Sequence, residues 1–221
     1  MSQFTIKPLS DQALLLQWSD TADLEVHRQV MDYHDTLQRN PFTGFVESVP
    51  AFTSLAVYYD VTAIRQTHAS AADFVMEFLR RINPEHIKRE SGKLVTIPVR
   101  YGGAEGPDLE EVAGENGIST EELVRLHTGR DYHVFMIGFT PGFAYLGFTH
   151  EKLSAKRKPA PRLSVPEGSV GLAGNQTGIY PASTPGGWQI IGRTAIRLFD
   201  ADREQPCLLE AGDRVRFIEV T

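Results

Sequence analysis

Hydrophobic and polar residues in the first part of the chain alternate in ways that predict both strands and helices. Apolar residues occupy every second position at residues 4–6 and again at 14–18, which is the period of a short strand or hairpin. Over residues 26–37 they recur at spacings of three and four, which predicts one face of a helix. We expect that helix to begin near Asp20 and to end at Pro41.

Two more strands and a second helix follow. Alternation at residues 46–49 and 55–59 predicts the strands, and Ser70 is placed as the N-cap of a helix that ends at the Asn-Pro pair 83–84. With one more strand, or with the first stretch split in two, the order strand, helix, strand, strand, helix is the ferredoxin-like plan. We expect this α+β domain to cover residues 1–88.

The pattern changes after a polar stretch at residues 84–92, which we interpret as a linker. A strand is expected at 95–99, followed by two short helices at 107–115 and 120–127. After them, short apolar segments lie between Gly and Pro turns, which is typical of a β-barrel or sandwich, and we expect this domain to cover residues 93–221. The later strands are expected at 133–138, 169–173, 188–191, 195–199 and 214–219.

The two helices resemble a helix-turn-helix but lack its chemistry. Ser119 and Glu122 form a capping box at the start of the second helix. A helix that reads DNA needs basic and amide side chains, whereas this one opens with Glu121 and Glu122. The whole chain of 221 residues carries a net charge of −6, which also argues against nucleic acid or an anionic membrane as the main partner. We therefore interpret the helices as a packed insertion.

The rest of the composition is that of an ordinary globular protein, with 41% hydrophobic and 23% charged residues. The single cysteine, Cys207, excludes an intramolecular disulfide and a Cys-rich zinc site. No apolar run approaches the ~18 residues of a membrane span, and no signal-peptide pattern opens the chain, so we expect a cytoplasmic protein. Neither a P-loop nor a metal-ligand spacing is present, and no metal site is predicted.

Glycine and proline are concentrated in one part of the chain. Ten of the 19 glycines lie between Gly138 and Gly192, and six of the 13 prolines lie between Pro141 and Pro185. In GFTPGFAYLG, glycine would let the backbone approach a ligand closely and the aromatic residues would supply apolar walls. The alternative is a plain turn with core aromatics. The candidate ligand contacts in this segment are Phe139, Pro141, Gly142 and Tyr145.

A second segment, AGNQTGIYP, places four neutral hydrogen-bonding side chains within six residues. Amides and hydroxyls in this arrangement suit the recognition of an amide-like or carboxylate-bearing small molecule. A Pro-Gly-Gly turn and an aromatic residue follow shortly afterwards. The candidate ligand contacts here are Asn175, Gln176, Thr177, Tyr180 and Trp188.

Charge also favours a site in this region. Residues 151–197 hold seven basic residues and two acids, and such a patch can hold a carboxylate or phosphate. A solvated basic loop explains residues 156–158, but it fits Arg162 less well, because that residue precedes an apolar stretch. His133 is a candidate base, although a histidine entering an apolar strand is more often a satisfied core residue. The set of catalytic groups is incomplete, as expected for a site shared with another polypeptide.

Three segments together indicate a family. GFTPGFAYLG, PRLSVPEGSVGLAGNQTGIYPASTPGGWQIIGRT and LFDADREQPCLLEAGDRVRF resemble the allophanate hydrolase subunit 1/KipI family. The resemblance is weak at the start of the chain and strong from about Pro98 onward. It implies an α+β protein with an N-terminal ferredoxin-like domain and a C-terminal cyclophilin-like β-barrel that carries the ligand cleft.

The resemblance also implies a function. Bacterial members of the family include the B subunit of an ATP-dependent 5-oxoprolinase, which converts 5-oxo-L-proline to L-glutamate. The B subunit is expected to act with the C subunit, which is of the allophanate hydrolase subunit 2 type, in activating the lactam, while the A subunit opens the ring. ATP, with magnesium, is the implied cofactor, and its site can lie on the B subunit, on the C subunit or between the two. The alternatives are an inhibitor of a sensor histidine kinase and a member of an allophanate- or urea-processing complex.

The resulting hypothesis is that the barrel cleft holds a planar amide or lactam. Asn175, Gln176 or Thr177 would hydrogen-bond its edge, and the aromatic residues would line the wall. Arg162, with help from Arg193, would neutralise carboxylate or phosphate charge. Arg162 and His133 are the expected catalytic residues, and the glycine-rich turns would add backbone donors for an anion.

Overall fold

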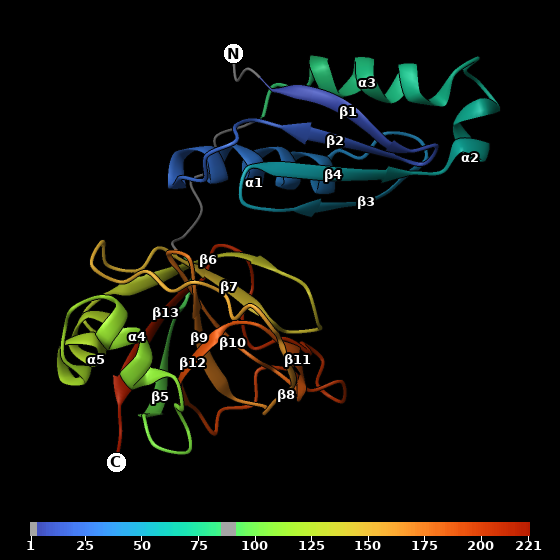
Figure 1. The fold of residues 1–221 in the computed structure, drawn as a ribbon. Helices are drawn as coiled ribbons and strands as arrows, with labels where there is room; N and C mark the ends of the chain where they lie inside the picture. Colours follow the sequence, from blue (N-terminus) through green and yellow to red (C-terminus); the bar gives the residue numbers. More distant parts are fainter. Residues whose placement is uncertain (1–3, 85–91) are drawn as a thin grey trace. The chain divides into compact units, whose positions relative to one another are not determined.

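A computed structural model describes residues 4–84 and 92–221 of the chain. The chain divides into two compact units, Met1–Arg89 and Glu90–Thr221, which Figure 1 shows as an open sheet with helices and as a barrel. The predicted linker at residues 84–92 falls almost entirely outside the described residues.

The sheet of the first unit consists of two antiparallel hairpins joined side by side (Figure 1). The first apolar stretch is split into two strands, one of the two forms that the alternation allowed. All three strand pairs are antiparallel, and the strand order is β1-β2-β4-β3. The strands are β1 (Thr5–Ser10), β2 (Ala13–Gln17), β3 (Phe45–Pro50) and β4 (Ser54–Tyr59).

Caps decide where the helices of this unit begin. α1 (Leu24–Arg39) starts later than predicted, because Asp23 is its N-cap and accepts the N–H of Val26 at 2.8 Å. α3 (Ala71–Arg81) starts after Ser70 as predicted. A short helix that was not predicted, α2 (Val61–Arg65), follows β4 and is capped by the side chain of Asp60. α1 packs on β3 and β4, and its apolar face joins α3 and the sheet in one core that includes Leu16, Leu37, Val57 and Leu79.

The second unit is a closed barrel of seven strands in the order β10-β7-β6-β13-β5-β12-β9, with β10 paired back to β9 (Figure 1). The pairing of β13 with β5 is parallel, and the other pairs are antiparallel. The strands are β5 (Leu94–Tyr101), β6 (Asp131–Ile137), β7 (Ala144–Gly147), β9 (Ser169–Ala173), β10 (Gln176–Ile179), β12 (Gln189–Arg193) and β13 (Arg214–Glu219).

Alternate side chains of these strands fill the barrel. Val134, Leu146 and Leu172 are among the fully buried residues of this core, which also takes in side chains from α4 (Leu109–Glu115) and α5 (Thr120–Thr128). The two helices therefore are a packed insertion, as predicted. A separate two-stranded ribbon is formed by β8 (Arg162–Val165) and β11 (Thr184–Gly186).

The strand predicted at residues 195–199 is wrong. The hydroxyl of Thr194 accepts the N–H of Ile196 at 3.1 Å, and this local bond competes with a strand ladder. Residues 195–199 make one isolated bridge, between Phe199 and Cys207. The sequence patterns also missed β7, β8, β10 and β11, which lie in the segments rich in glycine and proline.

Candidate functional site

The register of β7 and β10 decides which of the predicted site residues can meet. At one end of this strand pair Ala144 lies opposite Ile179, beside the loop that follows β6. At the other end Gly147 lies opposite Gln176, beside the turn at Asn175. Three residue steps of about 3.3 Å, roughly 10 Å in all, separate the two ends. The predicted ligand contacts therefore form two groups, one at each end.

The first group is a cluster of aromatic rings on the outer side of the barrel wall. The ring of Phe143 is central, and the ring centroids of Tyr145, Tyr180 and Trp188 lie 4.8, 5.2 and 5.5 Å from its own. Val165 of the ribbon packs on the same cluster, which is separate from the barrel core. Tyr180 and Trp188, two predicted substrate contacts, are buried in this cluster.

Two glycines of the barrel wall make room for these rings. A Cβ atom added to Gly178 would lie 3.0 Å from the side chains of both Phe143 and Trp188. One added to Gly171 would lie 3.1 Å from the Cβ of Trp188. These distances are shorter than normal contacts between carbon atoms. The close approach that glycine permits is used here by the protein's own aromatic rings.

The loop at residues 138–143 presents an exposed aromatic side chain from a strained backbone. Phe139 has a φ of 69°, in the left-handed region, and its side chain is 64% exposed. The N–H of Gly138 donates to the carbonyl of Phe143, and the N–H of Phe143 donates to the carbonyl of Thr140, both at 3.0 Å. These bonds hold the strained residue in place, and strain at an exposed residue points to a functional role.

Two other predicted contacts of this loop differ in access. Pro141 is exposed, whereas Gly142 is buried at a φ of 81°. A Cβ atom on Gly142 would lie 2.7 Å from the Cβ of Phe199, so this glycine serves the packing of the loop. Tyr145 is half-buried, and burial raises the pKa of its hydroxyl. The accessible part of the first group is therefore Phe139, Pro141 and one side of Tyr145.

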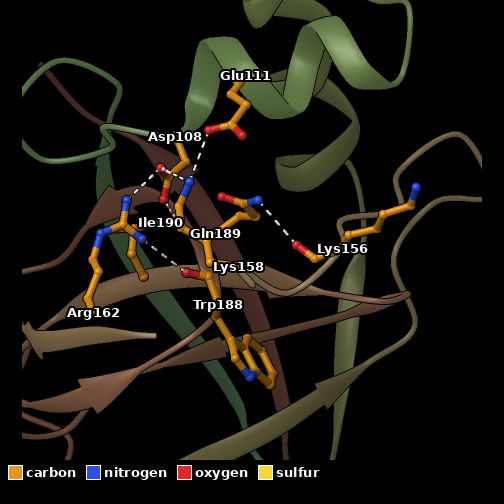
Figure 2. A network of polar contacts seen from close by, with 8 residues as sticks. All are labelled: Asp108, Glu111, Lys156, Lys158, Arg162, Trp188, Gln189 and Ile190. Atoms are coloured by element: carbon orange, nitrogen blue, oxygen red, sulfur yellow. Dashed lines mark hydrogen bonds and ion pairs between the residues drawn. The ribbon is translucent and has the colours of Figure 1, made fainter. Parts of the chain in front are cut away.

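Arg162, at the start of the ribbon, is held in an ion-pair network (Figure 2). Its Nη2 donates to Oδ1 of Asp108 at 2.6 Å, and its Nη1 donates to the backbone carbonyl of Trp188 at 3.4 Å. Oδ2 of Asp108 accepts the backbone N–H of Ile190 at 2.6 Å. The amino group of Lys158 lies 3.0 Å from Oδ1 of Asp108. The network fastens the ribbon to the barrel and to the residue that precedes α4.

The charges in this network stabilise one another. Burial alone would raise the pKa of Asp108, but hydrogen bonds from Arg162, Ile190 and Lys158 outweigh it and hold the pKa below its usual value. The carboxylates of Glu111 and Asp108 accept hydrogen bonds from Lys158 and raise its pKa. Asp108, at 3% exposure, is therefore an ionised carboxylate shared by two cations.

Acids from elsewhere in the chain neutralise much of the predicted basic region. The prediction that residues 156–158 form a solvated loop is wrong for Lys158, whose side chain is 20% exposed and is bound by two carboxylates. Sequence counting missed these pairs, because Glu111 lies 47 positions before Lys158. The ion pairs are Lys158 with Asp108 and Glu111, Arg162 with Asp108, Arg193 with Glu105, and Arg197 with Asp200.

Thr177 is fully buried, and its hydroxyl has partners inside the barrel. The hydroxyl donates to the carbonyl of Gly171 at 3.1 Å and lies 2.9 Å from Nε2 of His127. Because its own proton is used, it accepts from Nε2–H, and Nδ1 of His127 then accepts from the hydroxyl of Tyr101 at 2.8 Å. A substrate contact through Thr177 would require one of these bonds to break.

His127 is a satisfied core histidine. Its ring is stacked on Phe217 with the centroids 4.5 Å apart, and no part of the residue is exposed. Burial lowers the pKa of His127 to about 3 and raises the pKa of Tyr101 well above its usual value. The pair is therefore uncharged, and it joins α5 to the barrel strand that carries Thr177.

His133 lies on the outer face of the barrel in the second group. It pairs with Gly147 on β7, and Gln176 pairs with the same glycine from the other side, so the two side chains are about 10 Å apart across β7. The ring of His133 meets that of Phe135 edge-on at 4.9 Å. In the closed strand order, β6 is separated from β12, which holds the Arg162 network, by β13 and β5. The fold therefore does not bring His133 and Arg162 together.

Asn175 lines a hollow of about 500 Å³ near this end of β7 and β10. The side chain of Asn175 is exposed, whereas Gln176 on β10 is half-buried. Sequence reasoning singled out Asn175 but missed the residues that surround it, since Arg130 and His150 come from other loops. The hollow is lined by Arg130, Thr149, His150, Glu151, Leu153, Ser154 and Asn175.

Within residues 4–84 and 92–221, no group of three or more His, Cys, Asp or Glu side chains is arranged to hold a metal ion. In the same parts of the chain, no helix is both long and apolar enough to cross a membrane.

Comparison with known proteins gives a consistent result. Residues 4–209 match the family described as carboxyltransferase domain, subdomain C and D. A protein of Bacillus subtilis, named as the B subunit of 5-oxoprolinase, is 41% identical, over 99% of this chain and 94% of its own length. A protein of the same name from Escherichia coli O157:H7 is 38% identical, over 95% of this chain and 93% of its own.

A solved structure supports the fold. The crystal structure of TTHA0988 superposes with a TM-score of 0.81 at 37% sequence identity. The match covers 95% of the present chain but 40% of that protein, so the chain spans less than half of this longer relative.

Proposed function

This chain belongs to the family of the carboxyltransferase domain, subdomain C and D, and from that premise we propose that it is the B subunit of an ATP-dependent 5-oxoprolinase complex. The observation that carries the proposal is that the match to bacterial relatives of that name spans nearly the whole of this chain and nearly the whole of each relative. The match spans 99% of this chain and 94% of the Bacillus subtilis protein, so it covers nearly all of both. An equivalent role in the complex is the simplest consequence.

The proposed reaction opens the lactam ring of 5-oxo-L-proline to give L-glutamate. ATP, with magnesium, would transfer its γ-phosphoryl group to the lactam carbonyl oxygen and leave as ADP, at a site shared with the C subunit. With the A subunit, water would then open the activated ring and release inorganic phosphate. The longer extent of TTHA0988 supports a fixed partner, because the region outside the match offers room for a second module in the same chain.

The two groups of predicted contacts then take different roles. At the Asn175 end, amide side chains suit the edge of a planar lactam, and His133 is the candidate base on the same outer face. At the loop end, the exposed Phe139 and Pro141 form an apolar surface that suits the partner protein. Arg162, at 28% exposure, can assist only through the donors that Asp108 and Trp188 leave free.

Several finer features stay predictions of this proposal. They are the ferredoxin-like relationship of the first unit, the cyclophilin-like relationship of the barrel, the cytoplasmic location and the inactivity of the chain without its partners. The antiparallel sheet order β1-β2-β4-β3 and the closed barrel are compatible with the first two.

Reconstitution tests the proposed function. Mixing this chain with its cognate A and C subunits should produce ATP hydrolysis that depends on 5-oxo-L-proline, with glutamate as product. Each mixture that lacks one of the three proteins is a control and should lose glutamate formation. Urea and allophanate serve as alternative substrates in parallel. Turnover of those compounds without 5-oxoproline turnover, or no turnover at all in the complete mixture, would reject the assignment.

A further inference from the structure

The hollow beside Asn175 has the size of a small-molecule site. Its volume of about 500 Å³ lies within the ~300–1,000 Å³ usual for ligand pockets. Its lining combines Arg130, which follows α5, with a wall that is made by residues of the 149–154 segment and by Asn175, just before β10. Residues far apart in the sequence thus meet around one space.

Hydrogen bonds fix the backbone of the wall that the 149–154 segment and Asn175 form. The N–H of Thr149 donates to the carbonyl of Asn175 at 2.8 Å, and Ala155 and Gly174 exchange two bonds of 3.0 and 2.6 Å. The N–H of Ser154 donates to the side-chain oxygen of Asn116 at 3.0 Å. These bonds hold the segment to the turn at Gly174 and Asn175 on one side and to Asn116 on the other. The hollow is therefore already formed without a bound ligand.

Three of the side chains that line the hollow, Arg130, His150 and Asn175, supply hydrogen-bond donors. Nδ1 of His150 accepts the backbone N–H of Lys152 at 3.2 Å, so the Nε2 position carries a proton and is left to donate. Among the described residues no ion pair joins Arg130 to a carboxylate, and its guanidinium carbon lies 6.0 Å from the ring centre of Tyr132. The exposed amide of Asn175 adds two N–H donors.

We propose that this hollow binds a small oxyanion, a carboxylate or a phosphate, with Arg130 as its charge partner and His150 and Asn175 as further donors. An arginine fork matches the two oxygens of such a group. Glu151 also lines the hollow and opposes an anion. Naming the carboxylate of 5-oxoproline as one source of the oxyanion rests on the proposed function, whereas the site itself does not.

Titration of the full chain with four probes distinguishes a carboxylate from a phosphate as the source of the oxyanion. The probes are 5-oxo-L-proline, 2-pyrrolidinone, inorganic phosphate and ATP, with binding followed by calorimetry and by the amide NMR signals of residues around Asn175. A carboxylate site binds 5-oxoproline but not 2-pyrrolidinone, which has the lactam without the acid. A phosphate site binds phosphate or ATP. If none of the four probes shifts those signals, the proposal is overturned.

Three variants that each replace one charged side chain by glutamine supply the sharper test. R130Q should weaken binding of the anion by about tenfold, because a charge-assisted fork is lost. E151Q should strengthen it severalfold, since an opposing charge is removed. R125Q is the matched control: Arg125 carries the same charge on α5, pairs with Glu122 and does not line the hollow, so affinity should stay unchanged at ~0.15 M salt.

The outcomes separate this inference from the proposed function. Equal affinity in R130Q and the unaltered protein, or equal weakening in R130Q and R125Q, would overturn the site. Turnover in the reconstituted complex is measured independently with the same variants. A complex that turns over normally with R130Q, although anion binding is weakened, retains both the function and the site but excludes the substrate carboxylate as the oxyanion that the site holds. A chain that binds the anion but supports no turnover retains the inference and loses the function.

Discussion

At the scale of single residues, the environment of His127 has a measurable consequence for stability. Burial lowers its pKa to about 3, against 6.5 for an exposed histidine. Between these values the unfolded chain binds a proton that the folded chain excludes. The free energy of unfolding should therefore fall as pH drops through this window, by about 1.4 kcal/mol per pH unit from this group, and the contribution is fully present above pH 6.5.

Urea unfolding from pH 7 to pH 4 measures this effect when two variants are compared. H127Q should be less stable at pH 7 and should show a shallower pH dependence, because the excluded proton is gone. H68Q makes the same substitution at an exposed histidine and should keep the slope of the unaltered protein. Equal slopes in H127Q and the unaltered protein would contradict a neutral, buried His127.

Sequence reasoning at this scale found residue types but not their partners. Asn175 was singled out as a ligand contact, and that role stays a prediction. The structure places Asn175 beside a hollow that Arg130 also lines, and Arg130 carries no local signal. Arg162 was recognised as unusual, but its partner Asp108 lies 54 positions earlier. Pairs at such separations are created by folding, so a sequence pattern of a few residues cannot contain them.

At the scale of elements, the packing of rings on barrel glycines predicts a cost for small substitutions. In G178A the new methyl group would meet Phe143, Trp188 and the carbonyl of Ala144 at about 3.0 to 3.1 Å. Because the neighbours are two buried rings and a backbone oxygen, relief requires the cluster to shift. The substitution should lower the free energy of unfolding by about 1–3 kcal/mol.

A second glycine provides the control for this substitution. A Cβ atom on Gly114, in α4, meets nothing within 4 Å. G114A should therefore leave stability unchanged or raise it by up to about 1 kcal/mol, since alanine favours a helix. Thermal unfolding measures the stability of both variants. The fluorescence of Trp188 reports whether the aromatic cluster shifts in G178A. A G178A variant as stable as the unaltered protein would show that these rings do not rest on the barrel wall.

The elements that sequence patterns predicted well are those with local signals. α3 and α5 begin where Ser70 and Ser119 cap them, and each cap bonds the N–H three residues later. β7, β10 and β11 span three to four residues and contain glycine or proline. Such segments are too short for an alternation of apolar and polar residues to predict a strand. Their strand character comes from partners on either side in the closed barrel and from the ribbon.

At the scale of the whole molecule, the glycine and proline excess has two explanations. Part of it builds short barrel strands and the wall under the aromatic cluster, which is a matter of packing. Part of it shapes the 138–143 loop that presents Phe139. The candidate ligand contacts fall into two groups at opposite ends of one strand pair. One group includes the exposed Phe139 and Pro141, and the other lies near the hollow that Asn175 lines.

The two units also have separate hydrophobic cores, and this leads to a prediction for the full chain. Leu16 and Leu37 belong to the core of the first unit, and Val134 and Leu146 to that of the barrel, with no residue shared between the clusters. L16A and L146A each remove a fully buried side chain and should each cost about 2–5 kcal/mol within their own unit. Amide hydrogen exchange of the full chain should therefore quicken in the first unit for L16A and in the barrel for L146A. Faster exchange throughout the chain in either variant would instead show that the two cores unfold as one, and the description of two independently stabilised units would then have to be abandoned.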